Sequence, residues 1–421
     1  MSDVLPVSAT IDKQEASNRS WDVVIAGAGV AGASLAIQLA KQGFSVLLVE
    51  AQRFPREKVC GGCLNQRAIA SLDQLGVLST CHTAGGVELN ALRIRQAGRD
   101  HRWAIPPMLS LRRSTLDTIL VQAAIASGVA YLDQTSASLG PRTDNDKPVA
   151  VQLKSVESAA RSGNSNVNQT ASIQSRIAVV ATGLTRSALA ERDEWPAEIT
   201  KGSRIGVQAL LRTEELAEAG WCWDQLLQLS AGNELRMLVG TNGYLGISQT
   251  DGDYYDFAAA LDPEAVRRIG SIPKVIDELL VSCQLPALGT LSPQRWASTP
   301  HLTRRSWPVA KNRVFLLGDA IGYIEPFTGE GMSWALAGAK ALSDLLASKL
   351  TAGSSESDAT KSIRQVEAAW NAWASGQRGQ RQAVCRWVAG QVRHPRRTAW
   401  LLRGLDWFPP VRNMILRKAT R

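Results

Sequence analysis

The feature that most constrains the fold is a glycine-rich turn between an apolar strand and a helix near the start of the chain. Residues 21–26 form a short apolar run, which is typical of a buried parallel strand. Residues 27–32 read GAGVAG, and residues 33–42 have the small and leucine side chains of a helix packed on a sheet. A second apolar run at 45–49 completes a βαβ unit. The sequence therefore predicts an α/β fold with a Rossmann-like parallel sheet.

The glycine spacing in this turn points to a bound dinucleotide. Gly27, Gly29 and Gly32 allow a tight turn and a close approach of a pyrophosphate to the backbone. The pyrophosphate would meet the helix where it begins, at Val30 and Ala31, because free N–H groups and the helix dipole favour an anion there.

An acidic residue at the end of the second strand completes the motif. Glu50 stands 18 residues after Gly32, where an acid accepts a hydrogen bond from a ribose hydroxyl. Ala51 and Arg53 follow it, and we include both in the predicted cofactor site.

A second glycine-rich turn decides between nicotinamide and flavin. Gly318, Asp319 and a following alanine come after a short apolar strand, and a turn with Gly329, Gly331 and Met332 leads into a helix. Together the two turns resemble the flavin signatures of the glutathione-reductase-type FAD proteins. The resemblance implies that Asp319 binds the ribityl chain and that the helix N-terminus faces the flavin, where its dipole would stabilise the anionic reduced ring.

A third segment narrows the family. Residues 55–64 read PREKVCGGCL, which resembles the PREKxCGG stretch of the geranylgeranyl reductases and their relatives. The resemblance implies that Lys58, Cys60, Gly61 and Gly62 lie in the flavin site.

Two further positions agree with this resemblance. Arg113 begins an expected helix and resembles the arginine that approaches the flavin diphosphate. Ala181, Thr182 and Gly183 follow a strand at the place where flavin hydroxylases carry an Asp-Gly motif. Over about residues 20–350 the chain therefore resembles the geranylgeranyl reductase and flavin-dependent monooxygenase superfamily.

The resemblance implies an FAD-dependent oxidoreductase. We expect a monooxygenase that uses NAD(P)H as a transient reductant and O2, and that acts on a hydrophobic polyketide, quinone or isoprenoid substrate. The alternatives are reduction of isoprenoid double bonds, as in the geranylgeranyl reductases, a flavin-dependent halogenase, and a non-enzymatic flavoprotein. The sequence identifies no catalytic acid or base and no metal site.

Departures from the family patterns keep these alternatives open. Thr182 replaces the aspartate of the hydroxylase motif, and Gly322 stands where aromatic hydroxylases usually have a histidine. Of the reductases' Tyr-x-Trp-x-Phe-Pro signature only Tyr244 is present. Trp221-Cys222-Trp223 resembles the start of the halogenases' Trp-x-Trp-x-Ile-Pro, but the Ile-Pro is missing.

Two cysteines near the first turn allow two interpretations. Cys60 and Cys63 have the Cys-x-x-Cys spacing of a redox pair, as in flavin disulfide reductases. Those enzymes need a second nucleotide-binding fingerprint, which is missing here. We therefore expect Cys60 to lie near the flavin and Cys63 to fill space.

The length and composition predict several domains. A chain of 421 residues, with 45% hydrophobic and 20% charged residues, is globular and divides into two or three units. We expect a disordered leader at 1–18, an FAD-binding domain from 19–84, 111–199 and 301–350, an antiparallel-sheet substrate domain from 85–110 and 200–300, and a basic helical tail at 361–421.

The whole net charge of +9 lies in the tail. Residues 381–421 contain nine arginines, one lysine and one acid, together with several tryptophans. No nucleic-acid-binding motif accompanies this charge, so we expect no nucleic-acid partner. Two alternatives remain: the tryptophans pack on the flavin domain as a lid with the arginines facing water, or the tail contacts an anionic membrane.

The ends of the chain and its cysteines bear on location. The polar N-terminus does not resemble a secretory signal, and no apolar run reaches the roughly 18 residues of a membrane span. Six cysteines in so long a chain suggest a reducing compartment. We expect a cytoplasmic protein, with contact at the inner face of a membrane as the alternative.

Overall fold

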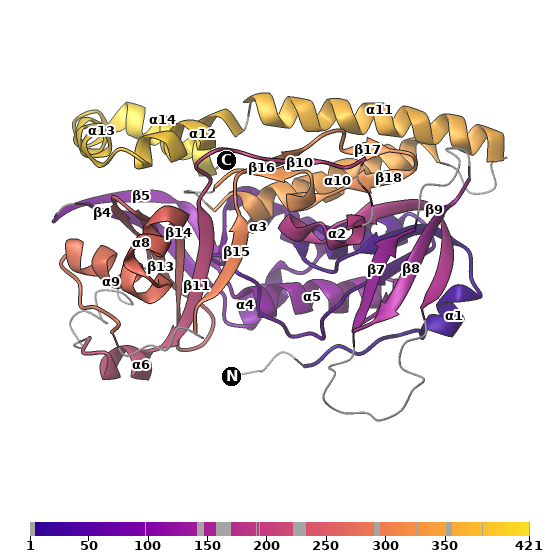
Figure 1. Ribbon diagram of the computed structural model, residues 1–421, viewed down its shortest axis with the longest axis horizontal. Coiled ribbons are helices and arrows are strands. Elements are labelled where there is room, and N and C mark those ends of the chain that lie inside the picture. Colours follow the sequence, from indigo (N-terminus) through magenta and orange to yellow (C-terminus); the bar gives the residue numbers. More distant parts are fainter. Residues whose placement is uncertain are drawn as a thin grey trace.

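The computed structural model describes residues 5–420 except 97, 141–146, 157–169, 191, 193, 222–232, 290–294, 326, 328, 351–355 and 381. Within these residues the chain forms two eight-stranded sheets, one three-stranded sheet and a group of C-terminal helices (Figure 1).

The first sheet is the Rossmann-like part of the molecule. Strands β18, β9, β1, β2 and β6 run parallel, and β7 and β8 extend the sheet from β9 as antiparallel neighbours. The chain supplies these strands from three separate segments. Their bounds are β17 (Ala310–Lys311), β18 (Val314–Leu316), β9 (Ala171–Val180), β1 (Trp21–Ala26), β2 (Val46–Val49), β6 (Ala130–Leu132), β7 (Thr135–Leu139) and β8 (Val149–Ser155).

Helices cover this sheet because its central strands are apolar on both faces. Helix α2 (Val30–Lys41) packs against α5 (Arg113–Ala126) and α10 (Gly331–Lys349). All four residues of β2 and nine of the twelve residues of α2 are buried. Continuous apolar strands are typical of parallel sheets. The predicted α/β fold class is confirmed.

The second sheet is almost entirely antiparallel, with one parallel pair between β12 and β4. Its outer face packs on α9 (Ile272–Ser282), beside α8 (Pro263–Ile269), and α6 (Thr213–Glu218) packs on β11 at one end. In sheet order the strands are β15 (Ala297–His301), β11 (Ile205–Arg212), β14 (Tyr254–Leu261), β13 (Gly243–Gln249), β12 (Glu234–Gly240), β4 (Val87–Gln96), β5 (Arg99–Ser110) and β3 (Cys63–Leu64).

One detail of the connection between the sheets differs from the sequence-based division. Strand β3, which we placed in the FAD-binding domain, joins the second sheet because it pairs with β5. A small sheet of β10 (Ala197–Ile199), β16 (Arg304–Ser306) and β19 (Gly322–Tyr323) joins two of the segments that we assigned to the FAD-binding domain.

The described part of the leader is ordered, so the expectation of disorder over 1–18 is corrected. Val7 pairs with Phe54 in a β-bridge, and α1 (Lys13–Ser17) follows. The Trp21 indole donates a hydrogen bond to the Ala16 carbonyl at 2.9 Å. The segment is held in place because Val7 and Ile11 are buried in the core of the first sheet. Residues 1–4 lie outside the described part.

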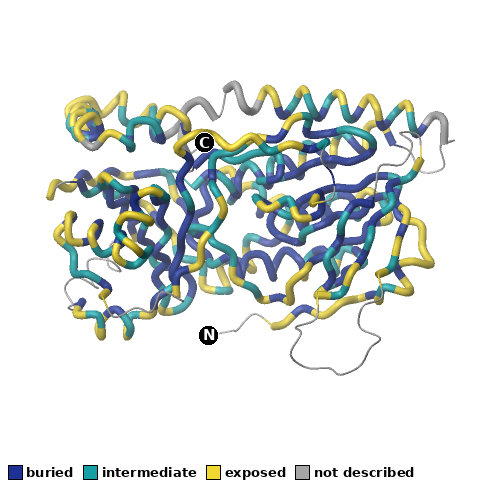
Figure 2. The backbone as a smooth tube through the Cα atoms, viewed as in Figure 1, coloured by how far each residue is buried: buried dark blue, intermediate teal, exposed yellow. Residues whose placement is uncertain are grey.

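The C-terminal helices cover both sheets. Helix α11 (Glu356–Gln380) runs along α10, and α12 (Gln382–Val392), α13 (Pro395–Trp407) and α14 (Pro409–Thr420) lie beside β4 and β5 (Figures 1 and 2). In α11, Trp370 is fully buried, stacks on Trp373 and donates to the Leu316 carbonyl.

The lid interpretation of the tail is corrected. Trp400 and Trp407, on α13, are 73% and 83% exposed, so neither packs on the flavin domain. The physical reason is the spacing of the apolar side chains: Leu402 and Leu405 occupy the face that packs on the second sheet, and the tryptophans fall on the opposite side.

Candidate active site

A cavity of about 500 Å³ lies between the glycine-rich turns of the first sheet and the inner face of the second. The turns after β1, β9 and β18 form one wall, and strands β11 to β14 form the other. The predicted cofactor residues that line it are Gly29, Val30, Ala31, Lys58, Cys60, Gly61, Arg113, Ala181, Thr182, Gly183, Gly318, Asp319, Gly329, Gly331 and Met332.

The remaining predicted cofactor residues lie outside the cavity wall. Gly27, Gly32 and Gly62 shape the turns behind it, and Glu50 accepts a hydrogen bond from the Ala28 amide at 2.9 Å instead of facing the cavity. Ala51 and Arg53 are exposed. A contact of these residues with a cofactor stays a prediction.

Glycine is required where the turns meet. Gly27 has φ +99°, and a Cβ there would lie 2.6 Å from the Ala181 carbonyl oxygen. At Gly318, with φ +62°, a Cβ would lie 2.9 Å from that of Ala31. Because L side chains rarely adopt such φ values and both positions are crowded, only glycine lets the first motif pack against the turn after β9 and lets the last motif pack against the first.

The part of the cavity at the glycine-rich turns has the features of a site for an anionic, polar ligand. Helices α2 and α10 both begin at it, and neither has a side-chain cap on its first N–H groups. The Thr182 hydroxyl is buried without a hydrogen-bond partner among the described residues. Uncapped helix N-termini bind phosphate and similar anions. The residues present therefore fit a dinucleotide such as FAD.

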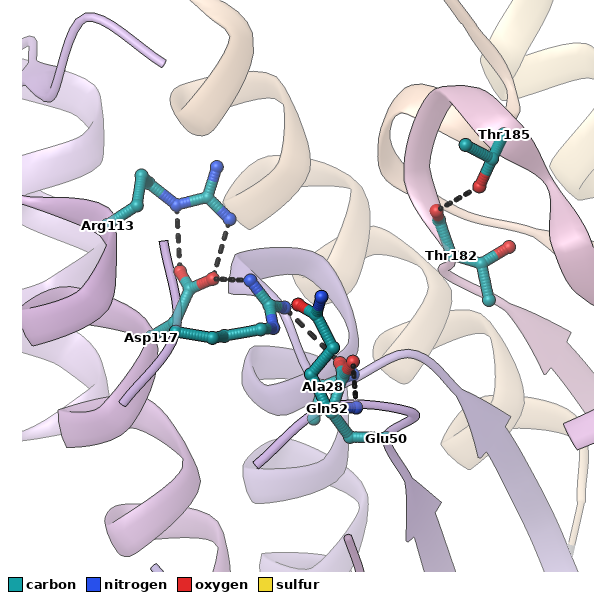
Figure 3. Close-up of polar contacts among 8 residues, drawn as sticks. Ala28, Glu50, Gln52, Arg113, Asp117, Thr182 and Thr185 are labelled. Carbon is teal, nitrogen blue, oxygen red and sulfur yellow. Dashed lines mark hydrogen bonds and ion pairs between the residues drawn. The ribbon is translucent and has the colours of Figure 1, made fainter. Parts of the chain in front are cut away.

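A chain of charged side chains supports the start of α2 (Figure 3). Arg113 donates two hydrogen bonds to Asp117, from Nε at 2.8 Å and from Nη2 at 2.7 Å. Arg56 bridges Asp117 and Glu50 at 3.3 and 3.2 Å. A Cβ on Gly29 would lie 3.4 Å from Arg113 Nη2 and 3.6 Å from Arg56 Nη2, so both guanidinium groups reach the helix start.

These charges set each other's protonation. Burial alone would raise the pKa of Asp117, but the guanidinium groups of Arg113 and Arg56 together lower it, and the carboxyl is ionised. Burial and the nearby Arg113 lower the pKa of Lys58. Arg113, paired with Asp117 although buried, stays charged because the pair raises its pKa. The cationic side chains are suited to the diphosphate of a dinucleotide.

At the other end of the cavity lies a polar cluster that the sequence analysis did not identify. Asp256 lines the wall beside Cys60 and Cys63. Gln208 lies behind it and donates hydrogen bonds to Asp256 and to the Cys60 carbonyl. Burial and the neighbouring Asp256 raise the pKa of the Cys63 thiol to about 12. A sequence signal existed, since Asp256 interrupts the apolar residues of a predicted strand.

The positions that depart from the family patterns are split between the cavity and the core. Tyr244 lines the cavity, with its ring 5.1 Å from that of Phe327 and its hydroxyl buried without a partner among the described residues. Trp221 lies on the outer side of the second sheet, 6.1 Å from the Phe257 ring. The rest of the halogenase-like stretch, from Cys222, lies outside the described residues.

Comparison with known proteins agrees with this geometry. Residues 20–204 match the family model of the FAD binding domain. This part of the chain is therefore similar to the FAD-binding domains of flavin-dependent oxidoreductases. The predicted cofactor, FAD, is thereby confirmed at the level of the domain.

Individual relatives differ in their reactions. The chain is 41% identical over 83 residues to the menaquinone reductase of Mycolicibacterium smegmatis, which covers 20% of each chain. It is 35% identical over 117 residues to a Bacillus subtilis protein described as an FAD-dependent monooxygenase, covering 25% of this chain and 31% of that one. The alignments thus span a fifth to a third of these relatives.

A solved structure shows the same fold over the whole chain. A flavin-dependent brominase superposes with a TM-score of 0.71 at 18% identity, covering 96% of this chain and 94% of the brominase. At this identity the likeness concerns the fold.

Proposed function

We propose that the protein is an FAD-dependent monooxygenase that uses NAD(P)H and O2 and acts on a hydrophobic substrate, of the polyketide, quinone or isoprenoid type. The observation that carries this proposal is a cavity that extends from the cofactor turns to an apolar wall of the second sheet. When bound, FAD would supply the redox chemistry, taking electrons from the nicotinamide and passing them on to O2.

The role of the chain's own residues is to bind and orient the substrate. Alternation along β13 places Tyr244, Gly246 and Ser248 on the cavity side, while Leu245 and Ile247 face the outer core. Small side chains along this wall leave room for a substrate.

The apolar residues that line the cavity favour a hydrophobic ligand. Apolar pockets with a few polar groups are typical small-molecule sites. The apolar residues that line the cavity include Val207, Leu235, Met237, Leu302, Phe327 and Ala335.

Two other reactions remain as alternatives with specific support. The resemblance to the reductases, and the local identity to a menaquinone reductase, favour hydride transfer to a double bond. The brominase likeness favours halogenation.

A labelling experiment separates the three reactions. FAD-loaded protein is incubated with NADPH or NADH, 18O2, bromide and a prenylated naphthoquinone, a polyene hydrocarbon or a hydroxyanthraquinone, and products are analysed by mass spectrometry. A product with one 18O atom supports oxygenation. A product with two added hydrogens and no oxygen label supports the reductase, and a bromide-dependent product supports the halogenase; either result overturns the monooxygenase proposal.

We also propose that the tail contacts an anionic membrane surface. No helix in the described part of the chain has the length and apolar character needed to cross a bilayer. Contact would therefore be peripheral. The exposed apolar side chains of the tail are Trp387, Trp400, Trp407, Phe408, Val411 and Met414.

The charge and attachment of the tail support this proposal. Leu402, Leu405 and Leu416 pack on the second sheet and hold the helices against the protein. Exposed tryptophans and arginines therefore lie on the outward side, with Arg403 placed 5.5 Å from the Trp400 ring. Tryptophan favours the membrane interface, and each basic residue near an anionic surface contributes about 1 kcal/mol.

Vesicle sedimentation tests this contact. The protein is spun with phosphatidylglycerol-containing and with pure phosphatidylcholine vesicles, at low and high salt. We expect salt-sensitive binding to the anionic vesicles, reduced in Trp400→Ser/Trp407→Ser but retained in the control Trp307→Ser, which removes an exposed tryptophan elsewhere. Equal sedimentation with both lipids, or none with either, would contradict the proposal.

A further inference from the structure

Asp256 is a buried carboxyl in the wall of the substrate cavity. It lies near the start of β14, opposite Ser248 of β13, and its residue is 1% exposed. Both residues line the cavity, beside the loop that contains Cys60 and Gly61.

One oxygen of this carboxyl is bonded and the other is not. Gln208 donates from Nε2 to Asp256 Oδ2 at 2.8 Å and to the Cys60 carbonyl at 2.7 Å. The Gln208 carbonyl oxygen accepts from the Cys60 amide at 3.2 Å, so the glutamine has a fixed orientation. Asp256 Oδ1 is buried without a hydrogen-bond partner in the described part of the chain.

The surroundings disfavour the ionised form. Burial is the main reason that the pKa of Asp256 is raised to about 8; the Gln208 hydrogen bond lowers the pKa in part, and the nearby carboxyls of Glu57 and Asp251 raise it. Arg112, the cation on this side, is engaged by Asp251 at 2.9 Å. The Cys63 thiol beside it is neutral because its own pKa is raised to about 12, and a thiol cannot supply a positive charge to stabilise the carboxylate.

The proton therefore lies on the unbonded oxygen. Because Oδ2 already accepts from the Gln208 amide, the O–H group of the neutral acid is on Oδ1 and has no acceptor among the residues that the structure describes. A buried donor without an acceptor is unfavourable, and an acceptor on a ligand would remove this cost.

The neighbouring positions leave space for a flat ligand. Ala258 and Ala260 follow Asp256 on the same strand and line the cavity, and Gly246 lies beside them on β13. A planar ring system could rest on this strip of small residues with its edge at Asp256.

We infer that Asp256 is a neutral acid that donates a hydrogen bond to an oxygen of the substrate, so that the site selects flat apolar molecules bearing a carbonyl or quinone oxygen over pure hydrocarbons. This inference rests on the proposed function in one respect: both take this cavity to be the substrate site.

Ligand pairs test the selectivity. We measure by calorimetry, at pH 6 and pH 9.5, the binding of 2-methyl-3-prenyl-1,4-naphthoquinone and of the corresponding naphthalene hydrocarbon to the FAD-loaded protein. One neutral hydrogen bond predicts a preference for the quinone of about twofold to tenfold at pH 6. The preference should fall at pH 9.5, because the proton is lost above the pKa of about 8.

Variants assign the preference to the acid. Asp256→Leu should bind both ligands alike, and Asp256→Asn, which keeps an N–H donor, should keep a preference that no longer depends on pH. Asp253→Asn, an exposed position in the adjoining turn, is the control and should behave as the native protein. If Asp256→Leu prefers the quinone as strongly as the native protein does at pH 6, and keeps this preference at pH 9.5, the inference is overturned.

Infrared spectroscopy of the ligand-free protein tests the neutral acid separately from the substrate class. We expect a protonated-carboxyl C=O band at pH 6 that disappears with a midpoint near pH 8 and is missing in Asp256→Asn. Absence of the band at pH 6 overturns the inference even if the proposed function holds. A band with weak binding of both ligands instead contradicts the proposed substrate class alone.

Discussion

At the scale of single residues, close packing and charge together prepare the cofactor site. Gly27 lets the first motif pack against Ala181, Gly318 lets the last motif pack against Ala31, and Arg113 is kept ionised by Asp117. Asp319 lies on the 3-10 turn after β18 and lines the cavity. Its carboxylate is therefore available to a cofactor hydroxyl.

Replacing Asp319 by alanine should weaken FAD binding without unfolding the protein. A hydrogen bond to a charged acceptor contributes about 1.5–3 kcal/mol, which corresponds to a roughly 10- to 150-fold higher dissociation constant. Fluorescence titration of the apoprotein with FAD measures it, and Asp344→Ala on the exposed side of α10 is the control. An unchanged dissociation constant would rule out this role for Asp319.

The cysteines of the PREKVCGGCL stretch should not add a second redox centre. Both are free thiols, and burial raises the pKa of Cys63 to about 12 and also raises that of Cys60. Disulfide exchange needs a thiolate, which is scarce at these values. We expect anaerobic dithionite titration to stop at two electrons per FAD, in the native protein as in Cys63→Ser. A four-electron end point in the native protein alone would show a redox pair.

At the scale of elements, one acidic side chain attaches helix α13 to the second sheet. Asp406 contacts His101 Nδ1 at 2.5 Å and accepts from the Trp103 indole at 2.8 Å, both on β5. Leu402 and Leu405 on the same helix are buried against the sheet. The attachment therefore combines an apolar stripe with a specific polar contact.

Replacing Asp406 by alanine should loosen α13 selectively. Loss of these contacts should cost about 1–3 kcal/mol, toward the lower end because the Asp406 side chain is 41% exposed. Amide hydrogen exchange should then increase in α13 and remain unchanged in α2. Exchange that rises equally in both helices would indicate global destabilisation instead of a local attachment.

At the scale of the whole molecule, the described residues form one core around the first sheet and two against the second sheet, one of which the tail completes. Leu402, Leu405 and Leu416 of the tail share a cluster with Leu92 and Ile94 of β4. The cofactor turns belong to the first core and to α10. Cofactor binding and tail packing thus use largely different parts of the molecule, which meet where Cys385 contacts Glu330 and Arg393 pairs with Glu325 at 3.1 Å.

Truncation after Gln380 should separate these two parts. Three buried leucines are lost, at about 1.5–3 kcal/mol each, so the second sheet should unfold at lower denaturant concentration. The FAD content after purification should remain close to that of the full chain. A colourless truncated protein would show that the tail is needed to hold the cofactor.

Local chemistry made much of the cofactor site predictable. Backbone approach at Gly29 and Gly331 needs glycine in a particular order between a strand and a helix, and this order is visible in the sequence. The motif spacings in the sequence did not identify Asp256 as a site residue. Its neighbours Gln208 and Cys60 come from β11 and from the loop before β3, so only the folded chain brings the three together.

The sequence by itself determined the α/β class, the flavin cofactor and the basic character of the tail, because turn chemistry, strand hydrophobicity and charge are local properties. The tertiary structure decided the order of residues 5–20, which rests on burial of Val7 and Ile11, and the direction in which Trp400 and Trp407 point. It also decided the burial of Asp256 beside Gln208. These features depend on burial and on charged groups from segments far apart in the sequence. Such burial and such neighbours exist only once the chain has folded.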